Sequence, residues 1–76
     1  GLGISRIEVP KDSRVSDLAL RNLGLRDQGL QVLLLEATDG SFSQPGPDSR
    51  LDPGMHVLVF GKLDVIQQAF APSQQD

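Results

Sequence analysis

Cysteine, tryptophan and tyrosine are absent from this chain, and histidine occurs once in its 76 residues. Without cysteine the chain can form neither a disulfide nor a thiolate metal site, and a single histidine does not suffice for a structural zinc site. We therefore expect no bound transition metal. The lack of cysteine is also compatible with a reducing compartment such as the cytoplasm.

Positive charge and long apolar runs are scarce as well. Seven basic against ten acidic residues give a net charge of 7 − 10 = −3, and the basic residues are scattered from Arg6 to Lys62 without forming a stripe. A nucleic-acid surface needs clustered basic residues, usually with aromatic side chains on which bases stack, so we expect no nucleic acid partner. No apolar run approaches the roughly 20 residues of a membrane-spanning helix, so no direct membrane insertion of this segment is expected.

Two short runs, residues 30–35 and 55–60, are apolar on both faces of a strand. Side chains alternate across a strand, so a strand with one wet face should alternate apolar and polar residues. A chain near this size buries only about 60% of the surface that its unfolded form exposes, which leaves little material to cover both faces. We expect a second copy of the chain to cover one of them, in a homodimer whose contact is formed by Leu33, Leu35, Leu58 and Phe60.

The pattern of turns and apolar residues predicts one α+β domain over residues 1–76, with an ordered core at about 4–70 and a polar tail at 71–76. Pro10 ends the first strand, Ser13 or Ser16 caps a short helix that stops at Gly24, and Asp39-Gly40 supplies a hairpin turn. The predicted order is strand, helix, strand, hairpin strand, strand, helix, in a mainly antiparallel sheet of about four strands. Beyond the short helix, the predicted elements are strands at 4–9, 30–37, around Phe42 and at 55–60, and a helix at 63–70. The chain begins with Gly-Leu-Gly and no initiator methionine, so we expect it to be a piece of a longer protein.

Catalytic chemistry finds little support in the sequence. His56 is the only imidazole that could serve as a base for a serine, and no nucleophile motif frames any serine, so we expect no enzyme. A small hydrolase fragment in which His56 meets a serine or a carboxylate is the weakest alternative. We interpret His56 as a core or rim residue, which would tune association between pH 5 and 8 if it lies in the dimer contact.

Three acidic residues in turns, Asp39, Asp48 and Asp52, raise the question of calcium, which prefers oxygen ligands. They lack the alternating spacing of a calcium-binding loop, and an aspartate in a turn usually caps its own backbone. Calcium is therefore the less favoured ligand.

Four stretches, in this order and spacing, resemble the TrkA-C domain, the C-terminal lobe of the RCK (regulator of potassium conductance) domain. The first is Ile7-Glu8-Val9 followed by Asp12-Ser13-Arg14-Val15. The second is Leu20-Arg21-Asn22-Leu23-Gly24-Leu25-Arg26 followed by Gly29-Leu30-Gln31-Val32-Leu33. The last two are Pro45-Gly46-Pro47-Asp48-Ser49-Arg50-Leu51 and Gly54-Met55-His56-Val57-Leu58-Val59-Phe60-Gly61.

The resemblance implies a ligand-sensing homodimeric module of a potassium or other cation channel or transporter, in the cytoplasm at the inner face of the plasma membrane. Ligands in the family include cyclic di-adenosine monophosphate and, in some channels, calcium; another small nucleotide is a further possibility here. The positions that match those of nucleotide-binding relatives are Leu25, Arg26, Gln31 and Val32, with Pro45 as an apolar wall. A guanidinium suits phosphate, and a carboxamide can both donate to and accept from a base. The alternative is that Arg26 and Gln31 are ordinary surface residues and the chain is a purely structural dimerisation domain without a ligand.

Overall fold

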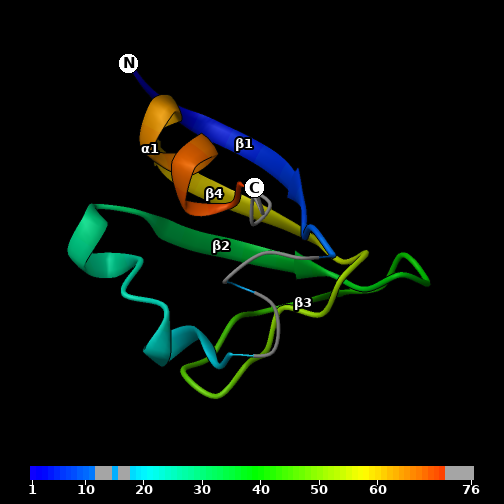
Figure 1. Ribbon diagram of the computed structural model, residues 1–76. Coiled ribbons are helices and arrows are strands. Elements are labelled where there is room, and N and C mark those ends of the chain that lie inside the picture. The colour runs from blue at the N-terminus through cyan, green and yellow to red at the C-terminus, as the bar shows by residue number, and fades with distance from the viewer. Residues whose placement is uncertain (12–14, 16–17, 72–76) are drawn as a thin grey trace, which may run out of the picture.

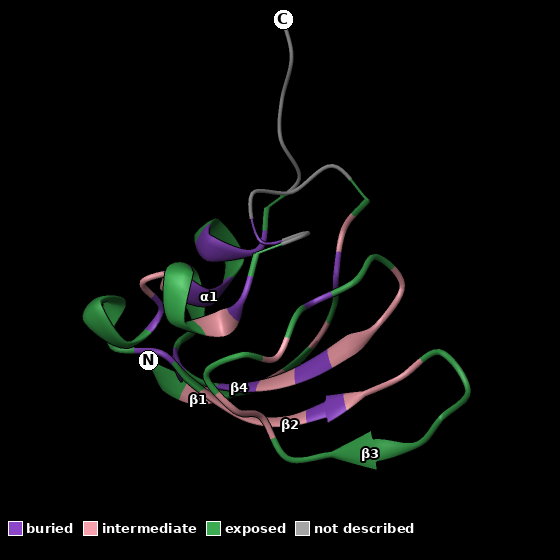
Figure 2. Ribbon diagram, turned by 90° about the horizontal axis from the view of Figure 1, so that it is seen from below, coloured by how far each residue is buried: buried purple, intermediate pink, exposed green. Residues whose placement is uncertain are grey.

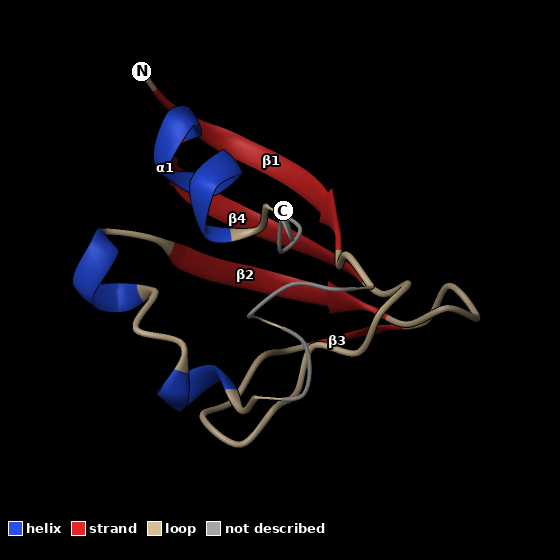
Figure 3. Cartoon of the chain, viewed as in Figure 1, coloured by secondary structure: helices blue, strands red, loops and turns tan. Residues whose placement is uncertain are grey.

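The computed structural model describes residues 1–11, 15 and 18–71 of the chain. Its centre is a four-stranded antiparallel sheet in the order β1-β4-β2-β3 (Figure 1). The strands are β1 (Leu2–Glu8), β2 (Gln31–Glu36), β3 (Phe42–Ser43) and β4 (His56–Lys62), and the last strand leads directly into helix α1 (Leu63–Ala69). Two short 3-10 helices, η1 (Leu20–Asn22) and η2 (Arg26–Gln28), precede β2 (Figure 3). The predicted α+β class and antiparallel sheet are confirmed.

The region of the predicted first helix differs in detail from the expectation. Its start at Ser13 or Ser16 falls outside the described residues, and its second half consists of η1 and η2, separated at Gly24, which has a φ of +68°. The backbone N–H groups of Leu20 and Arg21 donate to the carbonyls of Ser49 and Pro47 at 2.8 and 3.1 Å. These two donors are therefore satisfied by a distant loop, and no regular helical ladder includes them.

The hydrophobic core lies on one side of the sheet, between the strands and α1 (Figure 2). Val57 and Val59 of the inner strand β4 are 1% and 0% exposed because their side chains point to the side of the sheet that faces the core. Of the apolar residues Leu63, Ile66 and Phe70, the last two are buried, whereas Leu63 is 42% exposed. The core comprises Val9, Val15, Leu23, Leu25, Leu30, Leu35, Leu51, Val57, Val59, Ile66, Ala69 and Phe70.

An irregularity in β2 changes which residues share a face. The pairing of β2 with β4 shifts register between Val32 and Leu34, so Val32 pairs with Val59 while Leu35 pairs with Val57. Such a bulge adds a residue to one strand, and the alternation of side chains restarts beyond it. Leu35 is consequently 4% exposed in the core.

The predicted grouping of Leu33 and Leu35 with Leu58 and Phe60 on one face is therefore wrong. Leu34, which pairs with Leu58, takes the place expected for Leu35, and Leu33 lies within the irregular step itself. Leu58 and Phe60 do lie together on the side of the sheet away from the core, because they alternate along β4 with the buried Val57 and Val59.

Candidate ligand-binding groove

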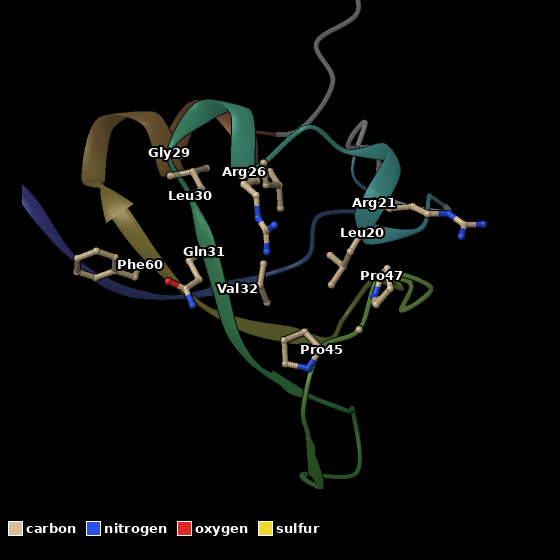
Figure 4. Close-up of a pocket in the computed structure, with 12 residues that line it drawn as sticks. Leu20, Arg21, Arg26, Gly29, Leu30, Gln31, Val32, Pro45, Pro47 and Phe60 are labelled. Atoms are coloured by element: carbon tan, nitrogen blue, oxygen red, sulfur yellow. The ribbon is translucent and has the colours of Figure 1, made fainter.

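A groove of about 830 Å³ opens between η1, η2, the start of β2, the end of β4 and the loop at 45–47 (Figure 4). All five residues that the sequence predicted as ligand contacts line it: Leu25, Arg26, Gln31, Val32 and Pro45. The structure therefore brings together side chains from three segments that are separated in the chain. It also adds Leu20, Arg21, Gly29, Leu30, Gly46, Pro47 and Phe60.

The turn around η2 determines how Arg26 and Gln31 come to face the same space. Gly29 ends η2 with a φ of +78°, a conformation that glycine adopts without the cost other residues incur. The N–H groups of Gln28 and Leu30 both donate to the Leu25 carbonyl at 3.0 Å, so the chain folds back on itself before entering β2. Leu25 and Leu30, which are 5% and 4% exposed, anchor both ends of this turn in the core.

The two arginines of the groove differ in their partners. Arg21 Nη1 lies 2.8 Å from Asp48 Oδ1, and its side chain points away from the groove, whereas Arg26 points into it toward Val32 (Figure 4). No ion pair of Arg26 is found within the part of the chain that the structure describes. Arg26 therefore offers its guanidinium to an incoming anion.

The opposite wall of the groove is held by main-chain contacts. Besides the hydrogen bonds from Leu20 and Arg21, the Gly46 N–H donates to Ser49 Oγ at 2.9 Å, and Ala19 forms an isolated β-bridge with Arg50. Pro45 and Pro47 then present fixed, apolar rings toward the groove. A wall that is ordered before a ligand arrives reduces the entropy lost on binding.

Gln31 and Phe60 form the other end of the groove. They are cross-strand partners on β2 and β4, and Figure 4 shows them side by side, with the Phe60 ring 39% exposed. Sequence reasoning placed Phe60 in the dimer contact and missed its place in the groove, because the β2–β4 register is not visible in the sequence. Arg21 lay inside one of the family-like stretches, but nothing in the sequence indicated its pairing with Asp48.

The remaining candidate residues lie away from this groove. His56 Nε2 lies 3.8 Å from Glu8 Oε1 on the sheet. The Ser41 hydroxyl and N–H both donate to Asp39 Oδ1, at 2.6 and 2.9 Å, and these hydrogen bonds lower the pKa of Asp39. Among residues 1–11, 15 and 18–71, no three His, Cys, Asp or Glu side chains are grouped in a way that could hold a metal ion.

Comparison with known proteins agrees with the fold. The sequence profile of the TrkA-C domain family matches residues 4–73. The chain belongs to this family. No curated protein matches it closely enough in sequence to count as a relative.

Three solved structures share the fold at 28% sequence identity. One is the RCK_C domain dimer of S. agalactiae BusR in complex with c-di-AMP, with a TM-score of 0.76, 91% of this chain and 90% of that chain covered. The other two are S. agalactiae BusR bound to its busAB and busA promoter DNA, with TM-scores of 0.75 and 0.76 and coverage of 88% and 91% of this chain. This chain spans only 35% and 37% of those BusR chains. Neither the family nor these structures indicates an enzyme.

These structures correct the expectation that no nucleic acid partner is involved. The composition argument considered only the surface of this domain, yet BusR contains the same fold and binds promoter DNA. The acidic balance of one domain therefore does not exclude DNA as a partner of the whole protein. In the described part of the chain, no helix has the length and apolar character needed to cross a membrane.

Proposed function

We propose that this chain is the ligand-sensing dimerisation module of a cytoplasmic regulator, and that its groove binds a cyclic adenine dinucleotide. The observation that supports this proposal is the convergence of Leu25, Arg26, Gln31, Val32 and Pro45 on one groove. The BusR domain, which is similar in fold and 28% identical, was solved as a dimer with c-di-AMP.

Each groove residue has a chemical role in this proposal. Arg26 supplies a planar fork of donors to a phosphate, and the Arg26 guanidinium has no competing carboxylate among the described residues. Gln31 both donates to and accepts from the edge of a base. Leu25, Val32 and Pro45 provide the apolar surface against which the base and sugar pack.

The signal is a change in the population of dimer arrangements. A ligand shifts such an equilibrium only as far as it binds one arrangement more tightly than another. The groove shares Gln31 and Phe60 with the sheet surface away from the core, so a ligand bound there lies beside a surface that a partner can contact.

The parent protein has two candidate activities that such a module could regulate. The family resemblance favours control of a potassium or other cation channel or transporter, with the module held at the inner face of the plasma membrane. The second candidate is control of transcription, which the BusR–promoter complexes favour. Domains encoded beside this one distinguish the two: membrane spans support the first, and a DNA-binding domain supports the second.

Calorimetric titration of the chain with c-di-AMP tests the ligand. We expect Arg26→Ala to weaken binding by about ten- to a hundredfold, because a charge-assisted hydrogen bond contributes about 1.5–3 kcal/mol. Lys11→Ala is the matched control, since it removes a positive charge from an exposed residue that does not line the groove, and it should leave the affinity within about threefold of the wild type.

Absence of binding heat in the wild type, together with no rise in melting temperature at saturating c-di-AMP, would reject the nucleotide and favour a purely structural dimerisation domain. A ligand that binds only the folded chain must raise the melting temperature. A thermal-shift series with calcium included checks the less favoured ligand in the same experiment.

A further inference from the structure

The end of the groove at Gln31 carries an exposed aromatic ring, that of Phe60. Among the described residues that line the groove, Phe60 is the only aromatic one, and it is 39% exposed. The other two phenylalanines lie elsewhere, since Phe70 is buried in the core and Phe42 of β3 does not line the groove. A flat apolar ring that is open to water beside a groove is a surface that a ligand can cover.

The sheet determines where the Phe60 ring lies. Phe60 belongs to the inner strand β4, with Ile4 of β1 directly opposite on one side and Gln31 of β2 on the other. Side chains of directly opposite residues project to the same side of a sheet, with Cβ atoms about 4.5–5.5 Å apart. The ring and the Gln31 carboxamide are therefore neighbours before any ligand arrives, which reduces the entropy lost on binding.

Charged and uncharged groups occupy different ends of the groove. Its two cationic lining residues, Arg21 and Arg26, come from η1 and η2, whereas the lining residues Gln31 and Phe60 carry no charge. In Figure 4 Arg26 lies on the side of β2 where Val32 projects, and Phe60 lies on the side of Gln31. A ligand that reaches from Arg26 to Phe60 therefore crosses the start of β2, with its anionic part at one end and its uncharged, flat part at the other.

We propose that Phe60 is a stacking platform for one purine base of the bound nucleotide, and that it places the edge of this base against the Gln31 carboxamide. The inference rests on the proposed function, in which Arg26 holds a phosphate. Phe60 adds an aromatic surface to the aliphatic wall of the groove. Stacking on an aromatic side chain is favourable for every base, so Phe60 supplies affinity for a base, and the hydrogen bonds of Gln31 discriminate between bases.

A series of substitutions at Phe60 tests whether the ring acts as an aromatic platform or only as an apolar side chain. We expect Phe60→Leu to weaken c-di-AMP binding about five- to thirtyfold in calorimetric titration, because a base then lies on an aliphatic side chain instead of an aromatic ring. Phe60→Trp should keep the affinity within about threefold of the wild type or improve it. Phe42→Leu is the matched control, since it removes an exposed ring that does not line the groove, and it should leave the affinity unchanged.

The composition of the chain provides a second, spectroscopic measurement. The chain contains neither tryptophan nor tyrosine, so the indole emission of F60W comes from this position alone. Stacking of a base on the indole should quench that emission, and the midpoint of quenching should equal the calorimetric dissociation constant. In F42W the indole lies outside the groove, and we expect c-di-AMP to leave its emission unquenched.

The outcomes separate this inference from the proposed function. If Arg26→Ala weakens c-di-AMP binding while F60L binds as the wild type does, or if F60W is not quenched, the stacking role is wrong and the proposed function stands. A loss of affinity in F60L that Phe60→Trp does not restore also overturns it. If F60L weakens ligand-free association in analytical ultracentrifugation by the same factor, Phe60 acts in the contact between copies and not on the base. A wild type that does not bind c-di-AMP rejects both.

Discussion

Gly61 at the end of β4 packs directly against Leu30, at the point where the chain enters β2. A Cβ added at Gly61 would clash with Leu30 Cδ2 and would lie 3.1 Å from the carbonyl oxygen of Gly29. The absence of a side chain at Gly61 therefore permits β4 to approach the turn that positions Arg26 and Gln31.

This contact predicts that Gly61→Ala destabilises the domain. We expect a loss of about 1–3 kcal/mol in the free energy of unfolding, because extra atoms in a packed region force backbone shifts. Urea denaturation measures it. Gly46→Ala is the matched control, since a Cβ there would meet only Ser49 Oγ at 3.8 Å and should change stability little.

The irregular step in β2 predicts unequal effects at two neighbouring leucines. Leu35 is 4% exposed, so Leu35→Ala should cost about 2–4 kcal/mol of unfolding free energy, whereas Leu34→Ala, on the side of the sheet away from the core, should cost about 1 kcal/mol or less. The comparison is made by urea denaturation in dilute solution, where association does not contribute. A larger loss at Leu34 than at Leu35 would show that the register of β2 is wrong.

The turn after β2 predicts a pH-dependent contribution to stability. Hydrogen bonds from the Ser41 hydroxyl and N–H hold the pKa of Asp39 below its ordinary value. A carboxyl whose pKa is lowered by folding stabilises the folded state above the ordinary pKa, and this contribution is lost as the pH falls through the lowered pKa.

A carbon-detected NMR titration of the Asp39 carboxyl should therefore show a midpoint below that of an unstructured aspartate. Ser41→Ala should move that midpoint upward, because it removes the hydrogen bond from the Ser41 hydroxyl, which is the largest cause of the lowered pKa. An unchanged midpoint in Ser41→Ala would contradict the hydrogen bond.

The strands and the groove residues were predicted from the sequence by different kinds of signal. Alternation of apolar residues and the Asp39-Gly40 turn are local signals, and they located β2, β3 and β4 to within a few residues. Arg26 and Gln31 were found because they match positions of a family whose profile covers residues 4–73. The start of the predicted first helix lies outside the described residues, and its second half depends on hydrogen bonds to a loop more than 20 residues away.

The sequence by itself determined that the chain has no disulfide and that it forms a small α+β domain. It also determined that the two apolar strands carry more apolar surface than α1 can cover. Only the tertiary structure decided which residues make that surface. Because of the single extra residue in β2, Leu35 lies in the core and Leu34 on the other side of the sheet. The cross-strand register places Phe60 beside Gln31 and Glu8 beside His56. Register depends on pairings between segments far apart in the chain, and a local pattern of side chains contains no information about them.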